Sequence, residues 1–105
     1  MSIVLDCPTQ GVMRFRCAQA GCPACLDALL REHSGLVYWM VMHQAGRKTA
    51  YADLLQAGWI GLWRAILHYE VGRGTAFSSY ACVVIRHQVW QLLKQEQKAE
   101  GWLEV

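Results

Sequence analysis

The feature that most constrains the fold is the spacing of apolar residues in the second half of the chain. Several of them recur at intervals that place them on one side of an α-helix: Leu55, Leu62, Ala65, Ile66 and Tyr69. Thr49 is a suitable N-cap, so this stripe predicts a long helix from Ala50 to about Tyr69. No alternating strand pattern of useful length occurs after residue 20, which favours an all-α fold.

The preceding segment predicts two further helices. Pro23 is typical of a first helical turn, and Ser34-Gly35 interrupts the helix that begins there. A second apolar run, residues 36–42, then continues to Ala45-Gly46, whose glycine suits a helix end. The region between residues 20 and 46 is therefore expected to form a helix pair.

Residues 70–74 contain two glycines and predict a tight loop, after which Ser78 caps a final helix to about Gln97. The prediction is a single-domain bundle of about four helices. Its boundaries are an N-terminal arm of strand-like or irregular form at 1–19, the helical domain at 20–98, and a C-terminal tail or linker start at 99–105. Gly58 and Gly61 weaken the long helix, and close packing against a neighbouring helix is the expected reason.

Size and composition suit one globular domain. A chain of 105 residues has room for one core, and 54% hydrophobic against 17% charged residues excludes a disordered tail. We find neither a membrane-spanning run nor a secretion signal, so the expected location is the cytoplasm. A net charge of +2 does not by itself indicate a nucleic-acid partner.

Four of the five cysteines lie in the first 25 residues: Cys7, Cys17, Cys22 and Cys25. Cys22-Pro-Ala-Cys25 has the spacing of a zinc knuckle, and Cys17 and Cys7 could complete four thiolates. Against this, Cys25 falls on the apolar face of a predicted helix, where cysteine is an ordinary small core residue. The favoured interpretation is structural thiols, with no metal and no cofactor, and zinc or a redox role remain the alternatives.

Two motifs carry a family resemblance. They are Asp53-Leu-Leu-Gln-Ala-Gly-Trp-Ile-Gly-Leu-Trp-Arg-Ala-Ile66 and Arg73-Gly-Thr-Ala-Phe-Ser-Ser-Tyr-Ala81, the second followed by Ile85-Arg86. In this order and at this separation they resemble regions 2.2 and 2.3 of the sigma-70 family of bacterial transcription factors. The preceding Leu29 to Met42 resembles region 2.1, and the resemblance covers about residues 20–98.

The resemblance implies docking on core RNA polymerase. In the family, the region 2.2 helix binds the clamp helices of the largest catalytic subunit. The matching positions here are Asp53, Gln56, Ala57, Ile60 and Trp63. The family usually has an acidic residue at Ala57 and a polar one at Trp59, so binding is expected to be weakened or redirected.

The resemblance also implies capture of the promoter −10 element, preferably as a single strand. Tyr80 matches the aromatic that stacks on a flipped adenine, and Glu70, Arg73 and Phe77 match residues around that pocket. The remaining positions expected to face DNA are Val83, Val84, Arg86, His87, Trp90 and Lys94. Val83-Val84 stand where primary sigma factors have a pair of tryptophans, and valine has no broad face to replace a base pair.

Less specific interpretations remain open for the same residues. Without the family, Tyr80 beside Phe77 is interpreted as a core aromatic, and core positions for both Trp59 and Trp63 are an alternative. A structural ion pair of Arg86 with an acid such as Glu70 is the alternative to a phosphate contact. We therefore keep two hypotheses: a non-enzymatic sigma-type initiation domain, or a sigma-like module that binds polymerase or an anti-sigma protein without opening DNA. The chain is either a fragment of a longer sigma factor or a natural single-domain relative.

Overall fold

The computed structural model describes residues 11–43 and 50–104, with side chains described as far as residue 95. All the regular secondary structure elements of these residues are α-helices, which confirms the all-α prediction. The helices are α2 (Val12–Gln19), α3 (Pro23–Glu32), α4 (Ser34–Met42), α5 (Tyr51–His68) and α6 (Phe77–Glu104). Three sequence features, namely Cys7, the Ala45-Gly46 helix end and the Thr49 cap, lie outside the described residues. No helix in the described part of the chain is long and apolar enough to cross a membrane.

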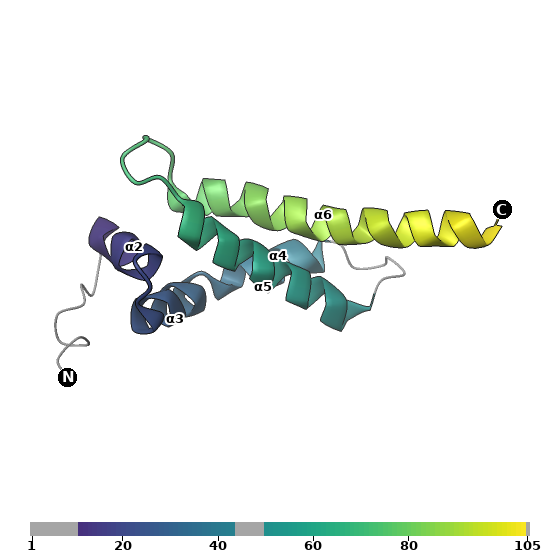
Figure 1. The fold of residues 1–105 in the computed structure, drawn as a ribbon, viewed down its shortest axis with the longest axis horizontal. Helices are drawn as coiled ribbons and strands as arrows, with labels where there is room; N and C mark the ends of the chain where they lie inside the picture. Colours follow the sequence, from purple (N-terminus) through teal and green to yellow (C-terminus); the bar gives the residue numbers. More distant parts are fainter. Residues whose placement is uncertain (1–10, 44–49, 105) are drawn as a thin grey trace.

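The body of the domain is the pair α5 and α6, which run side by side in opposite directions and are joined by the loop at residues 69–76 (Figure 1). α4 packs against both of them. α2 and α3 pack on each other and lie near the end of α5 from which the loop departs (Figure 1). The last turns of α6 extend beyond the other helices.

A single core joins all five described helices, with Ala18 as the contribution of α2. Its fully buried large side chains come from α3, α4, α5 and α6: Leu29, Val37, Val41, Leu62, Ile66, Ile85 and Val89. Burying each such side chain contributes roughly 1.5–3 kcal/mol. The expected stripe of α5 is confirmed at its centre, where Ala65 is also buried, whereas Leu55 and Tyr69 are only half-buried. Leu54 rather than Leu55 turns inward at the start of the helix.

The N-terminal arm was expected to be strand-like or irregular, and this expectation is wrong for its second half, which forms α2. A helix of eight residues is too short to be stable alone. Tertiary contacts stabilise it: Ala18 is buried, Phe15 packs on Tyr69 with ring centroids 5.0 Å apart, and Arg14 pairs with Glu32 at 2.7 Å. Because α2 forms through contacts with residues that are distant in sequence, the local sequence pattern did not indicate it.

The C-terminal boundary also differs from expectation. The sequence suggested a helix end near Gln97 and a tail from residue 99, because Gly101 disfavours helix. In the structure α6 continues to Glu104. One glycine in a long helix costs only about 1 kcal/mol relative to alanine, which the adjoining helical turns can offset.

Close packing explains both glycines of α5, as expected. A Cβ atom added at Gly61 would lie 2.7 Å from the Cα of Ile85, a backbone atom of α6. At Gly58 it would lie 2.8 Å from Cγ1 of Val37 on α4. Glycine thus lets the backbones of α5 and α6 approach more closely than alanine would permit.

Gly61→Ala is therefore expected to destabilise the domain even though alanine favours helix. Overpacking typically costs about 1–3 kcal/mol, and the gain in helix propensity returns up to about 1 kcal/mol. Gly35→Ala is the matched control, because its added Cβ would meet nothing within 4 Å. Urea unfolding should show a lower midpoint for Gly61→Ala and an unchanged or higher midpoint for Gly35→Ala. A Gly61→Ala midpoint at or above that of the wild type would contradict the packing described.

Candidate polymerase-docking and nucleic-acid interfaces

One face of α5 presents a strip of exposed side chains. Asp53, Gln56, Ile60 and Trp63 follow helical spacing and all point outward, and Trp63 is 43% exposed. This is the exposure that the docking hypothesis requires of Trp63. The neighbouring Trp59 instead packs against the core and is therefore not part of this face.

The strip borders a shallow groove between α5 and α6. From α5 it is lined by Asp53, Gln56, Ala57 and Ile60, and from α6 by Gln88, Gln91, Leu92 and Gln95. Ala57 is only 7% exposed, so its side chain offers little contact area, in contrast to the expectation that it is a docking residue. Sequence reasoning missed the α6 side, although glutamines spaced three and four residues apart indicate one polar helix face.

A second hollow lies where the loop meets the start of α6. Six residues line it: His68, Tyr69, Glu70, Arg73, Thr75 and Tyr80. Tyr80 is half-buried, with its ring centroid 5.8 Å from that of Tyr69. The expected association of Tyr80 with Arg73 and Glu70 in one concave surface is thus present.

Local interactions fix the shape of the loop. The hydroxyl of Tyr69 donates a hydrogen bond to the backbone oxygen of Thr75 at 2.6 Å. Gly72 and Gly74 have φ angles of 92° and 84°, in the left-handed region that favours glycine. Arg73 Nε lies 2.6 Å from a carboxylate oxygen of Glu70. Among the ion pairs of the described residues, Glu70 therefore pairs with Arg73 and not with Arg86.

Phe77, which was predicted to face DNA, does not line this hollow. It is 8% exposed and lies in an aromatic cluster with Phe15, His33 and Tyr69, at centroid distances of 4.7, 4.7 and 5.2 Å. The cluster adjoins the hollow, because Tyr69 belongs to both.

Gln19 is a structural contributor that sequence reasoning missed. Its side-chain amide donates to the backbone oxygens of Ile66 and Tyr69, at 2.9 and 2.8 Å. These bonds satisfy carbonyls at the end of α5 that lack a partner within the helix. They connect α2 to the residue from which the loop departs. The partners are 47 and 50 residues away in sequence, so no local signal indicated the contact.

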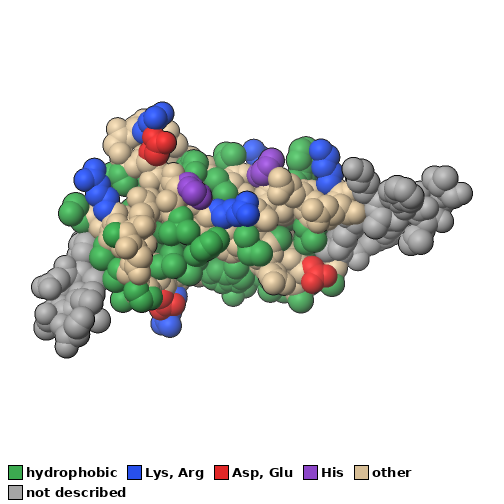
Figure 2. All heavy atoms as spheres, viewed as in Figure 1, with side chains coloured by type: hydrophobic (Ala, Val, Ile, Leu, Met, Phe, Trp, Pro, Cys, Tyr) green, Lys and Arg blue, Asp and Glu red, His purple; other side chains and the backbone are tan. Residues whose placement is uncertain are grey.

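The outer side of α6 continues from the hollow as a mixed aromatic and basic strip. Exposed side chains follow Tyr80 along α6 at helical spacing: Val83, His87, Trp90 and Lys94. Arg86 is also exposed. Figure 2 shows basic and histidine side chains spread over α5 and α6 with hydrophobic side chains between them. Val84 departs from expectation, because it is half-buried and packs against the core.

His33 is a half-buried titratable group within the aromatic cluster. Burial lowers its pKa below the ordinary value of 6.5, the carboxylate of Glu32 opposes this shift, and Arg14 adds to it. The folded domain therefore favours the neutral imidazole.

Stability is accordingly expected to fall as the pH drops below 6.5. The unfolded chain then binds a proton at His33 that the folded chain does not, until the pH also passes the lowered folded pKa. Above pH 6.5 the contribution is fully present. Thermal unfolding at pH 7.5 and 5.5 should show a smaller decrease for His33→Gln than for the wild type. Equal decreases in the two proteins would exclude His33 as a source of the acid sensitivity.

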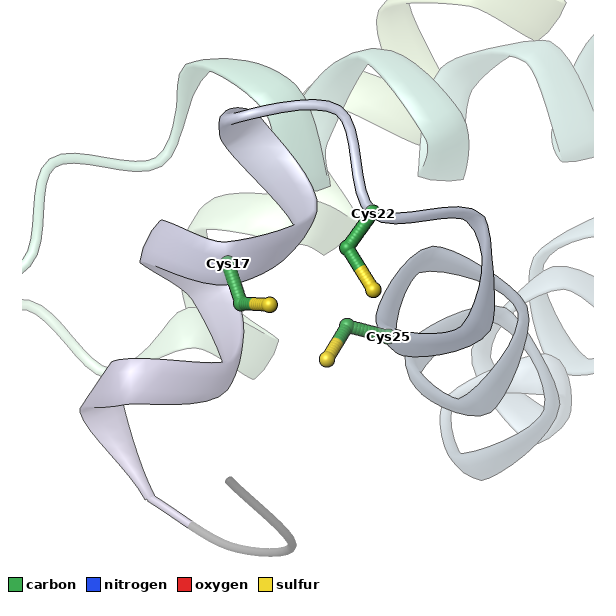
Figure 3. A group of neighbouring side chains, drawn as sticks. All are labelled: Cys17, Cys22 and Cys25. Atoms are coloured by element: carbon green, nitrogen blue, oxygen red, sulfur yellow. The ribbon is translucent and has the colours of Figure 1, made fainter. Parts of the chain in front are cut away.

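Three cysteines come together at the junction of α2 and α3. The sulfur atoms of Cys17, Cys22 and Cys25 all lie within 4.8 Å of one another (Figure 3). Cys25 is buried, as expected, and the other two are half-buried. The sequence interpretation favoured structural thiols with no metal, with a zinc ligand set as an alternative, and the structure gathers three of the thiols in one place.

Comparison with known proteins shows which family the chain belongs to. Residues 29–99 match the family model for sigma-70 region 2. The chain belongs to the sigma-70 region 2 family. The match to this family begins within α3 and covers α4, α5 and most of α6, so that both hollows lie inside it. α2 and the three clustered cysteines lie before it.

One relative of this sigma-70 region 2 domain is the RNA polymerase sigma factor FliA of Pseudomonas aeruginosa. The two sequences are 38% identical over 63 residues, which are 57% of this chain and 26% of the relative. The aligned part is thus about a quarter of the relative's length. No solved structure matches the chain.

Proposed function

We propose that this sigma-70 region 2 domain is the part of a transcription initiation factor that docks on core RNA polymerase and captures the promoter −10 element as a single strand. The observation that carries the proposal is the hollow shared by Tyr80, Arg73 and Glu70, three positions that the family resemblance assigns to the base-capture pocket. No catalytic step is part of this function.

The docking surface would be the exposed strip of α5 together with the groove beside it. Trp63 and Ile60 supply apolar area, and Asp53 supplies a negative charge at the rim. Tryptophan is enriched among the residues that dominate binding energy at protein interfaces. The clamp helices of the polymerase are the proposed partner for this face. An anti-sigma protein would compete for the same surface.

The DNA surface would be the hollow and the outer strip of α6. A half-buried Tyr80 can offer one ring face to an unpaired base, and such stacking contributes about 1–3 kcal/mol per base. The exposed cations Arg86 and Lys94 lie along the same helix, where a phosphate backbone would run.

The ion pair of Arg73 with Glu70 does not block this role. Both side chains are mostly exposed, at 74% and 64%, and exposed pairs contribute at most about 1 kcal/mol. Arg73 can therefore exchange the carboxylate for a phosphate at little cost.

Single-stranded DNA is the preferred form in this proposal because valines stand at the two positions where primary sigma factors have tryptophans that stack on a base pair. Val83 is 54% exposed but has no ring to stack on a base pair, and Val84 faces the core. Titrations with labelled −10-like DNA should thus show tighter binding of single strands than of the matching duplex, with affinity that falls as salt rises. Equal affinity for both forms would contradict capture of an unpaired base.

The second candidate is a protein-interaction module that binds polymerase or an anti-sigma protein without capturing DNA. Its support is the same loss of aromatic surface at Val83 and the burial of Phe77. A domain that binds core polymerase normally and shows no preference for single-stranded −10 DNA would favour this candidate.

A further inference from the structure

We propose that Cys17, Cys22 and Cys25 bind a zinc ion that fastens α2 to α3. This site lies outside the part of the chain that matches sigma-70 region 2, and it does not depend on the proposed function.

The first support is convergence from two elements. Cys17 comes from the last turns of α2, Cys22 directly precedes α3, and Cys25 lies in the first turn of α3. Their sulfurs point into the space between the two helices (Figure 3). Tetrahedral Zn–S bonds of about 2.3 Å place ligand sulfurs about 3.8 Å apart. The present separations, all within 4.8 Å, need side-chain adjustments of about 1 Å.

The second support is a tight turn that holds the ligands in place. Gly21 has a φ of 110°, a conformation that other residues rarely adopt, and it brings the chain back on itself. The backbone N–H of Cys22 donates to the backbone oxygen of Cys17 at 3.1 Å, which closes the turn. Two of the three ligands are thus fixed relative to each other by main-chain geometry rather than by side-chain packing.

Charge and ligand chemistry select the metal. Thiolates are soft ligands that favour zinc over magnesium or calcium, and a Cys-x2-Cys pair is a common half of a structural zinc site. The positive end of the α3 dipole lies at Cys22 and Cys25 and stabilises negative charge on their sulfurs. A water molecule can supply the fourth ligand and complete the tetrahedron.

A disulfide is the main alternative and fits the cluster less well. It would join two of the sulfurs and leave the third, whereas zinc uses all three. Zinc would also link α2, which is too short to be stable alone, to α3, and its binding free energy would stabilise the folded state. Through Gln19, which bonds the end of α5, this attachment reaches the loop that shapes the Tyr80 hollow.

The test is zinc binding by the purified full chain, kept reduced. The wild type should hold about one zinc per chain by elemental analysis, as one site of this kind implies. Cys17→Ser, Cys22→Ser and Cys25→Ser should each lower zinc affinity by at least about tenfold, the loss seen when even outer-shell partners are changed. Cys82→Ser is the matched control, since Cys82 is a half-buried cysteine of α6, and it should retain full affinity.

A second measurement avoids variants that fail to fold. In the wild type, added zinc should raise the melting temperature and protect Cys17, Cys22 and Cys25, but not Cys82, from alkylation as read by mass spectrometry. Several results would overturn the site: a metal-free protein that zinc neither stabilises nor protects, unchanged affinity in any of the three variants, or a disulfide within the cluster that persists in the presence of the reductant.

Discussion

Trp63→Ala is expected to weaken binding to core RNA polymerase by about 2 kcal/mol or more, which corresponds to about a 30-fold rise in Kd. Trp63 is exposed at the C-terminal end of the strip that begins at Asp53, and no other described side chain of that strip offers comparable apolar area. A large aromatic of this kind, once covered by a partner, commonly supplies much of the binding energy. Surface-immobilised domain titrated with core polymerase would measure the change.

Trp39→Ala is the matched control for this experiment. Trp39 is an even more exposed tryptophan, but it lies on α4 and not on the strip of α5. Its removal should leave the Kd for polymerase unchanged, and thermal unfolding should show that both variants remain folded. An unchanged Kd for Trp63→Ala would remove this residue from the interface, and equal losses in both variants would show that the effect is not local.

Tyr80→Ala is expected to weaken binding of single-stranded −10-like DNA by about 1–3 kcal/mol, a rise in Kd of about 5-fold to 150-fold. The reason is the loss of the Tyr80 ring, which lines the hollow at the start of α6 and precedes the basic strip of that helix. Fluorescence anisotropy with a labelled oligonucleotide, with the domain bound to core polymerase, would measure it.

Two variants separate stacking from other effects. Tyr80→Phe keeps the ring and should retain most of the affinity. Tyr51→Ala removes an exposed tyrosine at the start of α5, far along that helix from the loop, and should have no effect. A Tyr80→Phe variant as weak as Tyr80→Ala would show that the hydroxyl, and not the ring, makes the contact.

The helices that could be predicted from the sequence are those with strong local signals. Pro23 indicates the start of α3, and the apolar stripe indicates α5. Gly72 and Gly74 indicate the turn that separates α5 from α6. α2 has no such signal. It forms because Phe15 and Gln19 find partners near the end of α5, about 50 residues further on. Periodicity within a window cannot indicate contacts at that range.

The candidate sites show the same division between local and distant determinants. The exposure of Trp63 and the grouping of Tyr80 with Arg73 were expected from the family resemblance, and both are seen. Phe77 lies one turn from Tyr80 in sequence, but its ring packs in the cluster with Phe15 and not in the hollow. The cysteines show the converse, since their spacing allowed a ligand set and only the turn at Gly21 brings the sulfurs together.

The most direct test of the proposed function is capture of core RNA polymerase by the immobilised domain, with and without a single-stranded −10-like oligonucleotide. The proposed function predicts that the domain retains core polymerase, and that the resulting complex retains the −10 strand more strongly than a scrambled strand. Core binding without any preference between the strands would favour the interaction module. A domain that captures neither polymerase nor DNA would contradict the assignment of both surfaces.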